Sequence, residues 1–168
     1  VREFIAKDKP TKNMGIGLLE KRWLNAAKRL RRIVVTPAGR APYLQILARH
    51  LRAQRDHFDE WHLWTNTIVP QDLAAISRLA SDYSWVRVVP LDIPFNFNLS
   101  IHAFFKHCVD PAAAYLRLDD DIIWMDQDFV RKMFEFREQR PEFFLVYANI
   151  VNNAMLTHIH PRCGCIDY

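Results

Sequence analysis

The sequence predicts an α/β domain in which a mostly parallel sheet of about five strands carries helices on both faces. Short apolar runs recur every 25 to 29 residues or so, and a stretch with helical spacing separates each run from the next. The runs are continuously apolar, as strands buried on both faces require. Strand–helix–strand units of this length, joined by right-handed crossovers, give a parallel sheet.

Five apolar runs are expected to form the strands. Their lengths are typical of strands in globular proteins. They are RIVV (32–35), WHLWT (61–65), VRVVPL (86–91), YLRL (115–118) and FFLVYANIV (143–151).

Four stretches between these runs are expected to form helices, over 41–56, 70–83, 100–108 and 126–140. Proline near the start of the second helix, acidic residues in the first turn of the fourth and Pro141 after it are typical helix boundary signals. The predicted inward faces are Leu44, Leu47, Ala48 and Leu51 in the first helix, and Leu73, Ile76, Leu79, Ala80 and Tyr83 in the second.

Composition places the chain among ordinary globular domains. Its 168 residues are 50% hydrophobic and 25% charged, and no apolar run approaches the roughly 20 residues that cross a bilayer. We expect two parts, an N-terminal extension over 1–31 and the α/β domain over 32–168. We also expect the α/β domain to be incomplete at its carboxyl end.

The N-terminal extension contains a basic amphipathic helix, LEKRWLNAAKRLRR (19–32), which supplies much of the formal net charge of +4. Its basic face is either solvated or contacts a membrane surface or an acidic partner. Nucleic acid is not an expected partner, because no recognisable nucleic-acid-binding module accompanies the charge. These features favour a cytoplasmic protein with a peripheral membrane contact as an option.

Three cysteines give no disulfide framework, which agrees with a reducing compartment. The segment HIHPRCGC (158–165) gathers histidine and cysteine. Its H-x-H and C-x-C spacings differ from those of structural zinc sites, so zinc is not expected there.

Three consecutive carboxylates, Asp119, Asp120 and Asp121, follow the fourth predicted strand. Ligands of open α/β sheets bind beyond the carboxyl ends of the strands, so these side chains are expected at the ligand edge. In extended chain Asp119 and Asp121 point to the same side. Two carboxylates suit Mg²⁺ or Mn²⁺, which take phosphate oxygens as further ligands. The alternative is a solvated acidic turn before the next helix.

A strand ending in LDDD, fourth in a run of βα units, resembles the D-x-D motif of GT-A nucleotide-sugar glycosyltransferases of the family-2 type. The resemblance covers about residues 32–155. It implies a metal-dependent transfer of a sugar from a nucleoside diphosphate to an acceptor hydroxyl on a glycan, lipid or protein. It also implies Mn²⁺ or Mg²⁺ held by Asp119 and Asp121. The implied nucleotide-sugar contacts are Thr36, Pro37, Ala38, Gly39, Arg40, Asp92, Asp119 and Asp120.

The chain departs from the family pattern at two places. The Arg-Asn pair expected after Leu99-Ser100 is replaced by Ala103-Phe104, with His102 and Lys106 as basic candidates to compensate. No Glu-Asp pair follows the aspartates, so the catalytic base is unassigned and Asp167 is the remaining candidate. The acceptor side is expected to use Asn149, Asn152, Asn153, His158 and His160. The resemblance also implies that one of the two histidines is the late metal ligand of some GT-A enzymes.

Two other functions fit parts of the pattern. A GT-A-like module that binds a glycan or partner without catalysis would explain the missing Arg-Asn pair and base. A phosphotransferase with an aspartate nucleophile also places Asp-x-Asp after a strand, but that motif usually follows the first strand. A dinucleotide-binding domain is disfavoured, because no G-x-G-x-x-G follows any strand.

Overall fold

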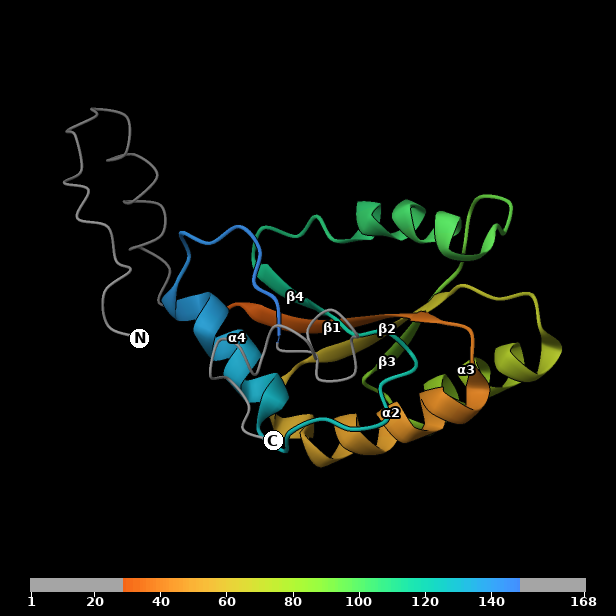
Figure 1. The fold of residues 1–168 in the computed structure, drawn as a ribbon, viewed down its shortest axis with the longest axis horizontal. Helices are drawn as coiled ribbons and strands as arrows, with labels where there is room; N and C mark the ends of the chain where they lie inside the picture. The colour runs from red at the N-terminus through yellow and green to blue at the C-terminus, as the bar shows by residue number, and fades with distance from the viewer. Residues whose placement is uncertain (1–28, 149–168) are drawn as a thin grey trace, which may run out of the picture.

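The computed structural model describes residues 29–148, which form a parallel sheet covered by helices (Figure 1). All neighbouring strands pair in parallel, in the order β3-β2-β1-β4. The α/β class, the parallel sheet and the flanking helices are therefore confirmed. The strands are β1 (Arg31–Ala38), β2 (Glu60–Thr65), β3 (Val86–Val89) and β4 (Ala113–Arg117).

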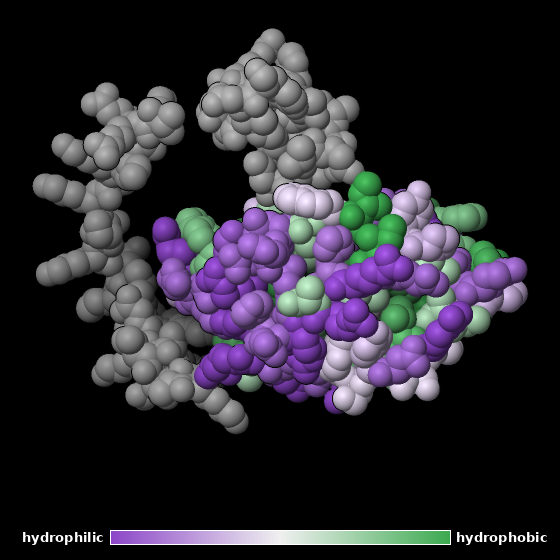
Figure 2. Space-filling view, turned by 90° about the horizontal axis from the view of Figure 1, so that it is seen from below, coloured by the Kyte–Doolittle hydropathy of each residue, from purple (hydrophilic) through white to green (hydrophobic). Residues whose placement is uncertain are grey.

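Three α-helices cover one face of the sheet, and a long 3-10 helix covers the other (Figure 1). The outward surface of the α-helical layer is mostly hydrophilic, as amphipathic helices on a buried sheet require (Figure 2). The helices are α2 (Ala41–Ala53), α3 (Pro70–Asp82) and α4 (Phe129–Gln139), with the 3-10 helices η1 (Arg55–His57) and η2 (Phe97–His107).

The larger core lies between the sheet and the α-helices. All four residues predicted to face inward from α2 are buried there: Leu44, Leu47, Ala48 and Leu51. On the other face, Trp64 of β2 stacks on Phe104 of η2, with ring centroids 5.2 Å apart. A partly buried ion pair also links the layers, since Arg32 of β1 donates to both carboxylate oxygens of Glu138 in α4 at 2.9 and 2.6 Å.

The fifth predicted strand does not form within the described residues. Residues 143–148 carry no regular structure, and 149–151 lie outside the described range. Phe144 and Tyr147 are almost wholly exposed, so in the described part this apolar run does not add to the core. The apolar pattern predicted a strand here because a short apolar run has the same composition whether or not a neighbouring strand pairs with it.

The inward face of α3 was predicted wrongly at its first turn. Leu73 is 37% exposed, whereas Asp72 and Ala75 are buried. Asp72 turns inward because its carboxylate accepts hydrogen bonds from the Ala41 N–H at 2.8 Å and from the Thr67 hydroxyl at 3.1 Å. A polar contact therefore sets the rotation of the first turn in place of the apolar pattern.

Strand β1 extends farther than predicted, since Thr36, Pro37 and Ala38 belong to the strand and not to the loop after it. Pairing with β2 continues to Ala38, opposite Thr65. Proline is tolerated at position 37 because pairing with β4 ends at Val35, opposite Arg117. In residues 29–148, no helix is long and apolar enough to cross a membrane.

Candidate functional site

The carboxyl ends of β1, β2 and β4 bring three loops together at one edge of the sheet. These loops start at Gly39, Asn66 and Leu118. Two backbone hydrogen bonds hold the loop starts to β1: Asn66 N–H to the Ala38 carbonyl at 3.0 Å and Leu118 N–H to the Val35 carbonyl at 2.9 Å. The aspartates that follow Leu118 therefore lie beside the loop that follows β1.

Asp120 is the buried member of the three aspartates, with 3% of its surface exposed. Its Oδ2 accepts the Gly39 N–H at 2.8 Å, and its Oδ1 accepts Nε and Nη2 of Arg40 at 2.9 and 2.5 Å. A buried carboxylate needs such charge-assisted partners. Here Asp120 supports the loop after β1, and the sugar contact that the resemblance implies for it stays a prediction.

Arg40 lies between two of the aspartates. Besides its bonds to Asp120, its Nη1 is 3.1 Å from a carboxylate oxygen of Asp121. The hydrogen bond to Asp120 raises the pKa of Arg40, and the charges of Asp120 and Asp121 add to it against the opposing effect of burial. About half of the Arg40 side chain is exposed, so part of its guanidinium stays accessible at this edge of the sheet beside the two carboxylates.

Asp119 and Asp121 are the accessible carboxylates, with 57% and 48% of their side chains exposed. Asp119 accepts a hydrogen bond from Arg117 at 2.8 Å. Arg40 contacts both Asp120 and Asp121, whereas Asp119 pairs with Arg117. That Asp119 and Asp121 point to the same side stays a prediction.

A cation at this edge would have to take part of its coordination from a ligand. Within residues 29–148, no group of three or more histidine, cysteine or acidic side chains could enclose a metal ion. Mg²⁺ is usually held by one or two carboxylates, substrate phosphates and waters, and not by an all-protein cage. Asp119 and Asp121 have Arg117 and Arg40 as their present positive partners, and that the two carboxylates share a cation stays a prediction.

The β1 residues predicted to contact a nucleotide divide into two groups. Thr36, Pro37 and Ala38 are buried in the strand, and the Thr36 hydroxyl accepts the Trp61 Nε1–H at 2.9 Å. These three residues are therefore part of the buried sheet. Gly39 and Arg40, by contrast, lie at the exposed end of the strand beside the aspartates.

The structure gives Gly39 a packing reason to be glycine. A Cβ at this position would lie 2.9 Å from the backbone oxygen of Asn66. Such a distance is shorter than real Cβ contacts, so the close approach is to the loop after β2 of the same chain.

Sequence reasoning missed two polar residues at this edge. The Asp72 carboxylate accepts the backbone N–H of Ala41, the first residue of α2. Asn66 lies beside Gly39, and its buried Oδ1 has no hydrogen-bond partner among the described residues. In the sequence, only their position after β2 marks these residues: Asn66 directly follows the strand, and Asp72 lies in the first turn of α3.

Asp92 is not brought to the aspartates. It follows β3, which lies at the opposite edge of the sheet from β4, and it forms an ion pair with Lys106 of η2. Lys106 is thus engaged with Asp92, while the ring Nδ1 of His102 lies 2.5 Å from the Leu99 carbonyl oxygen. The predicted acceptor residues Asn149, Asn152, Asn153, His158 and His160, and the candidate base Asp167, lie outside the described residues.

Comparison with known proteins gives no match: no family model, no curated protein and no solved structure matches this chain.

Proposed function

We propose that the edge formed by Gly39, Arg40 and the three aspartates binds a nucleoside diphosphate sugar with a divalent cation. We propose further that the protein transfers the sugar to an acceptor hydroxyl. One observation supports this most directly. A buried Asp120 fixes the loop after β1, and two accessible carboxylates, Asp119 and Asp121, remain on either side of it.

The charges of the site suit a diphosphate. Besides the N–H groups that it gives to Asp120 and Asp121, Arg40 keeps one N–H on each Nη for phosphate oxygens. Asp119 and Asp121 would hold Mn²⁺ or Mg²⁺, and the cation, when bound, would supply positive charge to the leaving diphosphate.

The transfer breaks the bond between the anomeric carbon and the phosphate oxygen and forms a bond to the acceptor oxygen. The acceptor hydroxyl loses its proton to a base, and the diphosphate leaves with the bonding electron pair. The candidate for that base remains Asp167.

The deciding experiment is thermal unfolding with Mn²⁺ and, in turn, UDP, GDP, CDP and dTDP. A ligand at 100 times its dissociation constant stabilises by about 2.7 kcal/mol, which is a shift of several degrees for a chain of this size. We expect a shift with one nucleotide, lost with chelator and lost in Asp121→Ala. Asp82→Ala, an exposed carboxylate at the end of α3, is the matched control and should keep the shift.

A second candidate is a binding module of the same fold without catalysis. The observation that favours it is that Asp119 and Asp121 already have positive partners, Arg117 and Arg40. The two functions separate in one assay. A catalyst releases the nucleoside diphosphate from its sugar donor with turnover, whereas a binding module shifts the unfolding temperature and leaves the donor intact.

A further inference from the structure

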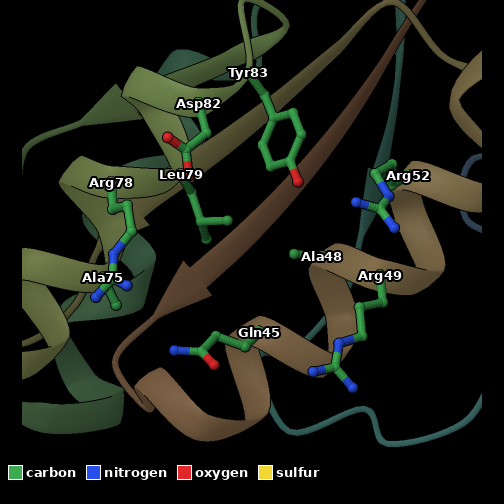
Figure 3. A pocket seen from close by; sticks show the side chains of 9 residues that line it. All are labelled: Gln45, Ala48, Arg49, Arg52, Ala75, Arg78, Leu79, Asp82 and Tyr83. Carbon is green, nitrogen blue, oxygen red and sulfur yellow. The ribbon is translucent and has the colours of Figure 1, made fainter.

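A groove of about 280 Å³ runs between α2 and α3 (Figure 3). Its apolar lining comes from Ala48 of α2 and from Ala75 and Leu79 of α3. The two alanines of this lining leave room that larger side chains would fill. The volume lies just below the roughly 300–1,000 Å³ of pockets for drug-sized ligands, so it suits a few side chains of a short segment.

The groove is separate from the candidate site. Both helices begin at the edge where the aspartates lie, because each follows the carboxyl end of a strand. The groove reaches Arg52 and Tyr83, which lie at the other ends of these helices. A ligand there would leave the sheet edge beside Asp121 open.

Arginines form the polar walls of the groove. Arg49 and Arg52 stand on the α2 side and Arg78 on the α3 side (Figure 3). Most other arginines of the described chain have a carboxylate within 4.0 Å, but in residues 29–148 these three do not. The lining thus carries three arginines against one acidic residue, Asp82, and keeps an excess of positive charge.

We infer that this groove docks a short acidic segment of a partner protein. Carboxylates of the segment would meet Arg49, Arg52 and Arg78, and a small apolar side chain would enter between Ala48 and Ala75. Arginine pairs carboxylates through two parallel hydrogen bonds, which gives such a contact direction as well as charge. Asp82 lies at the Tyr83 end and favours an N–H donor there, which sets the orientation of the segment.

The shape favours a peptide over a lipid surface. Peripheral proteins insert protruding apolar side chains into a bilayer. Here the apolar atoms lie at the base of a hollow, flanked by longer arginines (Figure 3). A narrow protruding segment reaches such a floor, whereas a flat array of headgroups does not.

The test pans a random 12-residue phage-displayed peptide library on the full chain. We expect enriched peptides to be acidic. Synthetic copies of them should bind the Arg49→Gln/Arg78→Gln variant at least ~10-fold more weakly, a loss of about 1.4 kcal/mol. The matched control removes two arginines from α4, as Arg131→Gln/Arg137→Gln, and should keep the affinity within about twofold.

Three results would overturn the inference. One is enrichment without acidic residues, or no enrichment at all. Another is an equal loss of affinity in the α4 control, which would mean that only net charge matters. The third is binding to phosphatidylcholine vesicles containing phosphatidylserine that depends on Arg49 and Arg78 while no acidic peptide binds. None of these results depends on nucleotide binding, so the experiment tests the inference independently of the proposed function.

Discussion

Asp120 holds the backbone of Gly39, with its Oδ2 2.8 Å from the Gly39 nitrogen. The same carboxylate accepts two hydrogen bonds from Arg40. The loop after β4 is thereby joined to the loop after β1 by a buried, charge-assisted contact. Of three adjacent aspartates, one is used to build the edge of the sheet, and this leaves the other two accessible for a ligand.

Asp120→Ala should destabilise the fold more than Asp121→Ala. Removing the buried carboxylate leaves the Gly39 N–H without its acceptor, which costs about 1–3 kcal/mol. It also removes the main partner of Arg40, whose half-exposed side chain water can solvate. Asp121 contributes a half-exposed ion pair, so its loss should cost less than about 1 kcal/mol. Urea unfolding of both variants measures the two free energies of unfolding.

Asp119→Ala is the control for that comparison, because its ion pair with Arg117 is equally exposed. It should unfold like Asp121→Ala. A stable Asp120→Ala protein would contradict the supporting role of Asp120 and return it to the group of ligand contacts.

Gly39→Ala should destabilise the protein by about 1–3 kcal/mol, the usual cost of forcing atoms into a closely packed place. The added Cβ would lie 2.9 Å from the Asn66 carbonyl oxygen, and that oxygen belongs to the backbone. The second variant, Gly39→Ala/Asn66→Ala, shortens the neighbouring side chain and leaves the carbonyl in place. It should not recover the loss, and recovery in urea unfolding would place the clash on the side chain.

Asp72→Ala should cost about 1–2 kcal/mol, a value typical of a lost helix cap. The carboxylate accepts the Ala41 N–H and the Thr67 hydroxyl, and both donors would lose their acceptor. Asp82→Ala, on the exposed end of the same helix, should change the free energy of unfolding by less than about 0.5 kcal/mol. Equal effects of the two substitutions would argue against a capping role for Asp72.

The sequence predicted the sheet well because each strand of a parallel sheet is buried on both faces. The runs around Val34, Leu63 and Leu116 are apolar for that reason and are buried in the structure. The side-chain roles at the sheet edge were harder to predict. Asp72 and Asp120 act through backbone N–H groups 31 and 81 residues away, and no local pattern marks such partners.

The 3-10 geometry of η2 also lay beyond the sequence pattern. A helix was predicted over 100–108, and the structure has a 3-10 helix over Phe97–His107. Both kinds of helix repeat apolar residues every three to four positions, so the spacing of Ile101 and Phe104 does not separate them. The last predicted run, around Phe144, shows the same limit for strands, since an apolar run does not state whether another strand pairs with it.

Glu60 should make the stability of the protein depend on acid. Burial works to raise its pKa, but the hydrogen bond with His62 and the charges of Arg87 and Arg31 outweigh burial and leave the pKa lowered. A carboxylate with a lowered pKa in the folded state stabilises the fold at pH values above its ordinary pKa, and that contribution is lost as pH falls through the folded value.

Glu60→Gln should therefore cost roughly 0.5–1 kcal/mol at pH 6, and the difference from the unaltered protein should shrink as pH falls below about 4.5. Urea unfolding at pH 6, 5, 4 and 3 measures this difference. Asp56→Asn, at an exposed residue of η1, is the control and should give a small difference at every pH. A difference for Glu60→Gln that stays constant down to pH 3 would mean that Glu60 acts by packing and not through its charge.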